Sequence, residues 1–247
     1  MQKPPSVAVV IPAYNEASTI RTCVQSCLDQ AIPFDEVIIV NNNSSDETQS
    51  ILEDMKQTNP QLILLDQNEY QGLVLTRNMG LDMAKSDIIG RIDADAILEP
   101  GWVEAVKRTF LDESISAASG PVLYHDMPLP KVGLAVDEKI RSTLHKMAKN
   151  HRFLFGTNMA IRRTAWLDIK DKVLPDPDDR HHEDISLALT LYQNDHEITY
   201  SPDMVAGMSA RRIEDKPFEF YKYVMFTYKK RLCDYHRYIF IRVFNQG

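Results

Sequence analysis

The stretch Gly90–Ala96, GRIDADA, joins an isoleucine-rich segment to two aspartates that lie one residue apart. A short apolar run of this kind is typical of a buried strand. If the chain stays extended, Asp93 and Asp95 point to one side and the small Ala94 to the other. The two carboxylates could then share one cation, and hard oxygen ligands favour Mg²⁺ or Mn²⁺. The alternative is that the aspartates only cap the strand or hold a turn.

Strands and helices alternate through the first 110 residues. The predicted strands are Val7–Ile11, Glu36–Val40, Leu62–Leu65 and the segment that ends at Ile92. The helices between and after them are predicted from apolar spacings, which include Ile20, Val24, Cys27 and Leu28; Ile51, Leu52 and Met55; Leu75, Met79 and Met83; and the segment WVEAVKRTF. This alternation predicts an α/β fold with a mostly parallel central sheet and helices on both faces.

Polar loops follow the first, second and fourth of these strands: PAYNEAST, NNNSSDET and DAD. Ligands of such sheets bind outside the carboxyl ends of the strands, so these loops should share one rim. The chain has neither GxGxxG nor GxxxxGK[ST], the phosphate loops of dinucleotide-binding and P-loop proteins. Any nucleotide must therefore be held in another way.

The second half is less regular. We expect a strand at Ile115–Tyr124, a helix at Val132–Asn150, a strand at Gly156–Arg162, a short helix at Arg163–Ile169 and an exposed loop at Leu174–His182. Glu183 and Asp184 then open a helix whose expected apolar stripe is Ile185, Ala188, Leu189 and Tyr192. The positive end of the helix dipole favours ionised carboxylates there. Capping alone would explain one of them, and two indicate a functional role.

Composition narrows the class of protein. The chain has 247 residues, 44% of them hydrophobic, and a formal net charge of −7, so we expect no nucleic-acid partner. Cys23 and Cys27 are spaced to pack on one helix face, which together with the odd total of three cysteines favours a reducing compartment. No apolar segment of the sequence is close to the length of about 18 residues that a membrane-spanning helix needs. We expect a cytoplasmic protein, and a location at the inner face of the membrane is compatible with this expectation.

Six ordered blocks resemble one family. They are VVIPAYNEAST, VIIVNNNSSDET, GLVLTRNMGL, RIDADAILEPGW, GTNMAIRR and HHEDISLAL. The similarity covers about residues 6 to 213. The chain resembles the family-two, inverting, nucleotide-sugar-dependent glycosyltransferases with the GT-A fold. The resemblance implies a single GT-A domain over residues 1–215, with a nucleotide-sugar half at 1–98 and an acceptor half at 99–215. It also implies a divalent metal, a nucleoside-diphosphate sugar as donor, and a saccharide or lipid-linked saccharide as acceptor.

The resemblance implies a role for each matched residue. Asp184 would be the general base, while Asp95, with Asp93, would hold the metal. Residues that would bind the donor are Pro12, Ala13, Tyr14, Glu16, Asn42, Arg77, Asp93, Ala94 and Asp95. Residues that would frame the acceptor or the donor sugar are Gly156, Thr157, Asn158, His182 and Glu183. Arg211 and Arg212 would hold the diphosphate or are simply solvated.

Two departures from the family pattern bear on the donor. Where relatives begin the second block with one or two aspartates, this chain has Asn41, Asn42 and Asn43. An amide can both accept from and donate to uracil, so Asn42 favours a UDP-sugar. Many such enzymes also supply a metal-binding histidine late in the fold, whereas Gly207, Met208 and Ser209 provide none.

Residues 216–247 form a predicted helical extension of different character. Its core, 218–244, interleaves aromatic side chains with lysines and arginines, a combination that suits a membrane interface or a contact between subunits. The leading alternatives to an enzyme of this family are a non-catalytic nucleotide-sugar-binding or scaffold protein and a sugar nucleotidyltransferase. A nucleotidyltransferase would be expected to carry a phosphate-binding loop rich in glycine and basic residues near its start. The segment PAYNEAST contains neither glycine nor a basic residue.

Overall fold

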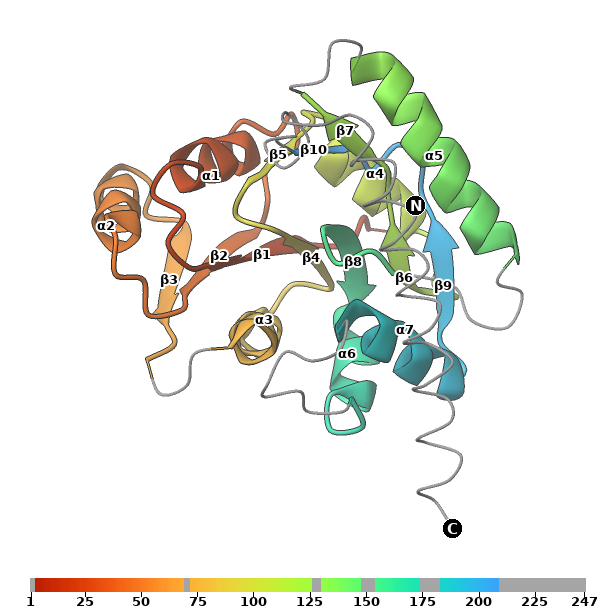
Figure 1. Ribbon diagram of the computed structural model, residues 1–247. Helices are drawn as coiled ribbons and strands as arrows, with labels where there is room; N and C mark the ends of the chain where they lie inside the picture. The colour runs from red at the N-terminus through yellow and green to blue at the C-terminus, as the bar shows by residue number, and fades with distance from the viewer. Residues whose placement is uncertain (1–2, 69–71, 126–129, 148–153, 174–182, 209–247) are drawn as a thin grey trace.

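The computed structural model describes residues 3–68, 72–125, 130–147, 154–173 and 183–208 (Figure 1). Its strands are β1 Val7–Ala13, β2 Glu36–Asn41, β3 Leu62–Asp66, β4 Ile88–Ile92, β5 Ala96–Leu98, β6 Ile115–Ser119, β7 Val122–Tyr124, β8 Asn158–Arg162, β9 Glu197–Tyr200 and β10 Ala206–Met208. Its helices are α1 Ile20–Leu28, α2 Thr48–Thr58, α3 Leu73–Met83, α4 Trp102–Thr109, α5 Pro130–Met147, α6 Arg163–Ile169 and α7 Glu183–Gln193.

The predicted α/β architecture is confirmed. A seven-stranded sheet has the order β3-β2-β1-β4-β8-β6-β9. β3, β2, β1 and β4 pair in parallel, as do β6 and β9, while β8 runs antiparallel to both of its neighbours. Strands β1, β2 and β4 therefore end at the same edge, and the loops that follow them share one rim, as the alternation predicts.

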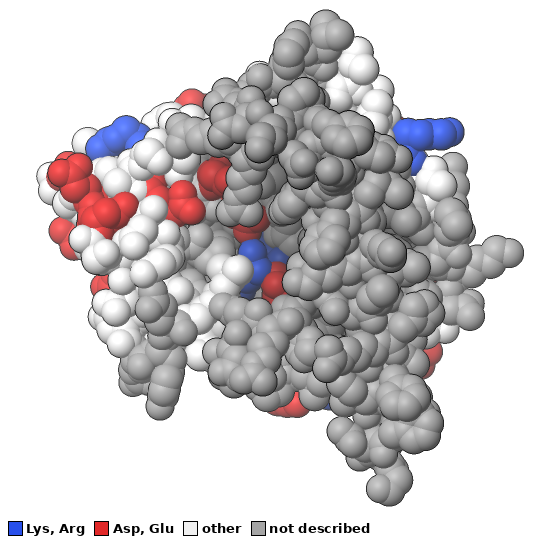
Figure 2. Space-filling model, in the orientation of Figure 1, with Lys and Arg blue, Asp and Glu red and all other residues white. Residues whose placement is uncertain are grey.

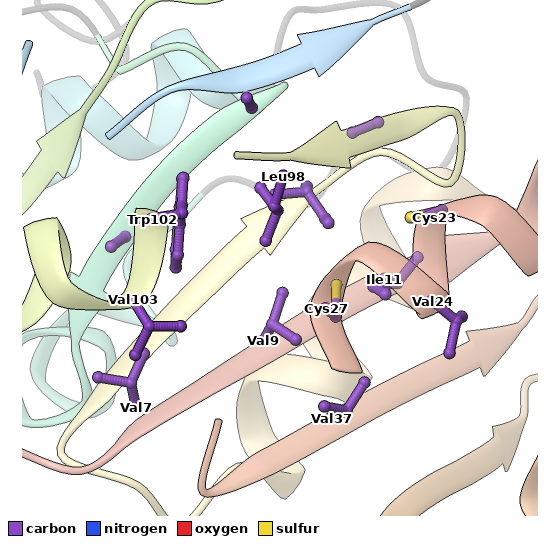
Figure 3. Close-up of a cluster of buried hydrophobic side chains, with 14 of the residues drawn as sticks. Val7, Val9, Ile11, Cys23, Val24, Cys27, Val37, Leu98, Trp102 and Val103 are labelled. Atoms are coloured by element: carbon purple, nitrogen blue, oxygen red, sulfur yellow. The ribbon is translucent and has the colours of Figure 1, made fainter. Parts of the chain in front are cut away.

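Helices cover both faces of this sheet (Figure 1). One hydrophobic cluster joins α1, α2 and α4 to one face, and Figure 3 shows Cys23 and Cys27 of α1 beside Val9 and Ile11 of β1. A second cluster joins α3, α6 and α7 to the other face. Both cysteines are buried and unbridged, so the prediction that they pack is confirmed.

A smaller sheet of three strands, in the order β5-β10-β7, lies beside the main one. Its existence corrects the single strand expected at Ile115–Tyr124, which is two strands in two sheets. The break falls at Pro121, which has no N–H to donate to a continuing ladder. Its carbonyl instead accepts hydrogen bonds from the backbone of Ala206 and the side chain of Asn158.

Helix α3 lies where it was predicted but buries a different face. The stripe of Leu75, Met79 and Met83 is packed only in part, since Met79 lies against the second cluster but Met83 is 45% exposed. The packed face carries Val74, Arg77, Gly80 and Leu81 instead. Gly80 sets this orientation, because a methyl group there would overlap the side chain of Val10 in β1. Hydrophobic spacing could not reveal a face that is defined by a glycine and an arginine.

Helix α7 shows a similar difference. Tyr192, the last member of its expected stripe, is largely exposed, whereas Leu187 and Leu191 are buried with Ala188 in the second cluster. The helix packs against both β9 and α6, so more than one of its faces is covered. Periodicity alone predicts a single face.

Replacing Gly80 with alanine should lower the free energy of unfolding by about 1–3 kcal/mol, because overpacking at a helix–strand contact forces a shift. Met83→Ala, on the face that hydrophobic spacing selects, should stay within about 0.5 kcal/mol. Urea denaturation of the two variants measures both values. A larger effect at Met83 than at Gly80 would contradict the packing described for α3.

Several predictions fall on residues outside the described ranges. They are the loop at 174–182, the end of α5 beyond Met147, the boundary at 215/216 and the helical extension at 216–247. Among the helices that are described, none combines the length and apolarity needed to cross a membrane.

Candidate active site

The first two loops of the rim are tied to each other by side chains. The Asn15 side chain accepts a hydrogen bond from the backbone N–H of Ser45 (2.8 Å), and Ser44 Oγ accepts one from the N–H of Asn15 (3.0 Å). Asn15 and Asn43 both adopt a left-handed backbone, with φ of 55° and 56°, which asparagine tolerates better than most residues. The loops are thereby held in a defined shape.

These bonds bring together the residues expected to hold a nucleoside. Asn42 donates its backbone N–H to the carbonyl of Ala13 (2.8 Å), so the ends of β1 and β2 lie side by side. Pro12, Ala13 and Asn42 are buried, whereas Tyr14 is 46% exposed. Asn42 Oδ1 also accepts a hydrogen bond from the N–H of Gly72 (3.4 Å). The exposed ring of Tyr14 therefore lies near the end of β2, where hydrogen bonds to Ala13 and Gly72 hold Asn42 in place.

The DAD segment is a turn rather than an extended strand, which corrects the geometry first expected for it. The N–H of Ala96 bonds to the carbonyl of Asp93 (3.0 Å), because the chain must leave the main sheet after Ile92 and enter the small one at Ala96. The three residues still differ in burial. Ala94 is buried, and Asp93 and Asp95 are partly exposed.

Two arginines and two carboxylates form an ion network at this rim. Arg77 of α3 pairs with Asp93 (2.8 Å) and also with Glu183, the first residue of α7. Arg91, next to the last residue of β4, pairs with the same Glu183 oxygen (2.9 Å) and donates to the carbonyl of Gly156 (3.2 Å). The Arg77 and Arg91 side chains are 7% and 2% exposed, so they need these partners.

The network shifts the pKa of its members. Burial alone would raise the pKa of Glu183, but the charges of Arg91 and Arg77 outweigh it and hold that pKa below its ordinary value. Burial would lower the pKa of Arg77, yet Asp93 and Glu183 raise it. Burial and the charge of Arg77 lower the pKa of Arg91. Glu183 is therefore a carboxylate at neutral pH.

Asp184 lies next to this network, as predicted, in the first turn of α7. It is 3% exposed, and its Oδ2 accepts a hydrogen bond from the N–H of Gly156 (3.2 Å). The Gly156 peptide thus contacts both Asp184 and Arg91, and a methyl group on Gly156 would overlap the Arg91 guanidinium. Hydrogen bonds and ion pairs thus connect Arg91 of β4 and Gly156 to the acidic pair at the start of α7.

Asn158 has a place inside the protein. Its side chain is fully buried, accepts from the Trp102 indole (2.9 Å) and donates to the carbonyls of Pro121 (2.8 Å) and Met204 (2.6 Å). These bonds join the main sheet to the small one. Asn158 therefore has a structural place, and the sugar contact expected of it is not part of our proposal. Gly156 and the partly exposed Thr157 stay at the rim. His182, Arg211 and Arg212 lie outside the described residues.

Sequence analysis missed Arg91. It stands between Gly90 and Ile92, at the start of the block RIDADAILEPGW, and was given no role of its own. An arginine inside a buried strand is a signal in itself, since a charge there requires an acidic partner. Figure 2 shows basic and acidic side chains side by side near the centre of the face that is turned to the viewer.

The chemistry of the exposed carboxylates fits a divalent cation. Asp93 and Asp95 offer the oxygen ligands that Mg²⁺ and Mn²⁺ bind. Within the described ranges, however, no group of three or more His, Cys, Asp or Glu residues gathers to hold a metal. A cation here would also use ligands from its substrate, as Mg²⁺ does with phosphates.

Solved structures share this architecture. The mannosyltransferase PcManGT from Pyrobaculum calidifontis, in complex with GDP-Man and Mn²⁺, has a TM-score of 0.65 and 24% identity, covering 84% of this chain and 57% of its own. S. aureus TarS in complex with UDP-GlcNAc has a TM-score of 0.62 and 18% identity, covering 83% and 58%. The fold is that of the GT-A glycosyltransferases.

The sequence comparison gives the family. The model of glycosyl transferase family 2 matches residues 8–169, and the chain belongs to this family. The putative glycosyltransferase EpsH of Bacillus subtilis is 31% identical over 162 residues, 66% of this chain and 46% of EpsH. The chondroitin synthase of Pasteurella multocida is 34% identical over 113 residues, 46% of this chain and 12% of that protein. The chain thus spans less than half the length of these relatives.

Proposed function

We propose that the protein transfers one sugar from a nucleoside-diphosphate sugar to a hydroxyl of a saccharide or lipid-linked acceptor, with inversion at the anomeric carbon. The observation that carries this proposal is the Asp93–Arg77–Glu183 network. It joins the carboxylate expected to contact the donor to the acidic pair expected to act on the acceptor. Both halves of a transfer reaction would thereby meet at one rim.

The donor would lie across the ends of β1, β2 and β4. The exposed Tyr14 ring offers a surface on which a base can stack, and Asn42 at the neighbouring strand end favours uracil. Asp93 would contact the ribose, with Arg77 beside the diphosphate. Asp95, with Asp93, would hold Mg²⁺ or Mn²⁺, which when bound neutralises charge on the leaving diphosphate.

Asp184 would act on the acceptor. A nucleoside diphosphate leaves as an anion and needs no proton, whereas the attacking hydroxyl must lose one. The Gly156 N–H holds one oxygen of Asp184, and Glu183 is anchored by two arginines, so the base has a fixed position. A single base and in-line attack on the face opposite the leaving group invert the anomeric configuration.

The test is release of nucleoside diphosphate from a panel of UDP- and GDP-sugars, with water as the acceptor. We expect release from one donor class with Mn²⁺, loss of activity in EDTA, and recovery when Mn²⁺ is restored. Asp95→Asn should lower the rate at least tenfold, while Asp112→Asn, an exposed carboxylate at a turn after α4, should not change it. Release that is indifferent to EDTA would contradict the metal, and no release from any donor, with water or with a panel of saccharide acceptors, would contradict the transfer.

A further inference from the structure

His125 follows β7, and its ring lies over the small sheet. Its backbone N–H bonds to the carbonyl of Met208 in β10 (3.2 Å). The ring turns back over Gly207, where any added methyl group would overlap Nε2. The imidazole therefore occupies the space that a side chain at position 207 would fill, and only glycine permits this placement.

The Nε2 atom of this ring is buried and has no hydrogen-bond partner in the described part of the chain. A buried polar atom without a partner is destabilising, because it has lost its hydrogen bonds to water. Native proteins rarely keep such an atom unless it serves an ion, a water or a ligand. An imidazole nitrogen with a free lone pair is also among the commonest metal ligands.

The register of the small sheet brings His125 toward Asp95. Met208 of β10 pairs with Ala96 on one side and with Tyr124 on the other. Asp95 precedes Ala96 and His125 follows Tyr124, so both adjoin the same end of β10. Their backbones are two strand spacings apart, about 9–10 Å. Because Gly207 has no side chain, the His125 ring can lie over β10, the strand between β7 and β5.

We propose that His125 is a ligand of the divalent cation that Asp95 holds in the proposed function, on which this inference rests. His125 precedes α5, so it differs from the late histidine of related enzymes, for which β10 offers only Gly207 and Met208. His125 with the carboxylates of Asp95 and Asp93 would still leave positions for the diphosphate and water. Because nitrogen ligands favour Mn²⁺ over Mg²⁺, the site selects Mn²⁺.

The experiment is pulsed electron paramagnetic resonance of Mn²⁺ bound to the full chain with UDP, and in parallel with GDP. The wild type should show echo modulation from a directly bound ¹⁴N. His125→Ala should abolish that modulation and weaken Mn²⁺ binding at least tenfold, while nucleotide binding in EDTA stays unchanged. Gly207→Ala, which displaces the ring, should also weaken Mn²⁺ binding.

The matched control is His196→Gln. The His196 ring forms hydrogen bonds with Ser116 and Asp168 (3.0 Å each) just before β9 begins, at the end of the strands away from the rim. This variant should therefore keep the modulation. A wild-type Mn²⁺–nucleotide complex without ¹⁴N modulation would overturn the role of His125 and leave the proposed function standing. A wild type that binds neither Mn²⁺ nor nucleotide would overturn both.

Discussion

Replacing Asp184 with asparagine should lower the rate of nucleoside diphosphate release about 10²- to 10⁴-fold, the range that a positioned general base contributes. The amide has the same shape, and its oxygen can still accept the N–H of Gly156. It cannot take a proton from the attacking hydroxyl. The nucleotide affinity, measured by calorimetry, should therefore stay within about twofold while the initial rate falls.

The control for this variant is Asp54→Asn, which changes an exposed carboxylate on α2 and should leave the rate unchanged. Thermal unfolding shows whether the Asp184 variant is folded. A folded Asp184→Asn protein that turns over as fast as the wild type would exclude Asp184 as the base and favour a binding or scaffold role for the chain.

Glu183→Gln should destabilise the protein by about 3–5 kcal/mol, the usual cost of removing one partner from a buried ion pair. One oxygen of Glu183 accepts from both Arg77 and Arg91. With a neutral amide in its place, Arg91 loses its paired carboxylate inside the protein, and the repulsion between the two guanidiniums is no longer screened. Urea denaturation measures the change in the free energy of unfolding.

The sign of the pH dependence follows from the lowered pKa of Glu183. Its stabilising contribution is complete above the unfolded glutamate pKa of about 4.3 and is lost as the pH falls through the lower pKa of the folded state. The difference in stability between the wild type and Glu183→Gln should therefore shrink in acid.

A double-mutant cycle identifies the cause. In an Arg91→Met background the buried charge is gone, so Glu183→Gln should cost less than in the wild type, with a coupling of about 1–3 kcal/mol. Glu138→Gln, on the exposed surface of α5, should stay within about 0.5 kcal/mol. Costs of Glu183→Gln that are equal in both backgrounds would contradict the shared pairing.

The first half of the fold could be predicted because each of its strands is a continuous apolar run between polar loops. Val7–Ala13 and Glu36–Asn41 carry this pattern, and their pairing alone places the loops that follow at one rim. The break at Pro121 was missed, since an apolar run does not show when a chain changes sheets. The turn after Asp93 was missed for the same reason.

The site was predictable in its carboxylates and not in its arrangement. Asp93, Glu183 and Asp184 stand out as acidic residues at element ends, where function is common. Their connection depends on Arg91, whose partner lies 92 positions away in the sequence. The placement of His125 depends on Gly207, and local patterns carry no information about such long-range contacts.

The central claim is that this rim binds a nucleoside diphosphate together with a divalent metal. Calorimetric titration of UDP and GDP into the purified protein, with Mn²⁺ and then with EDTA, tests it most directly. We predict that one nucleotide, UDP by the argument from Asn42, binds with Mn²⁺ at least tenfold more tightly than in EDTA. Absence of binding by both nucleotides under both conditions would contradict the account.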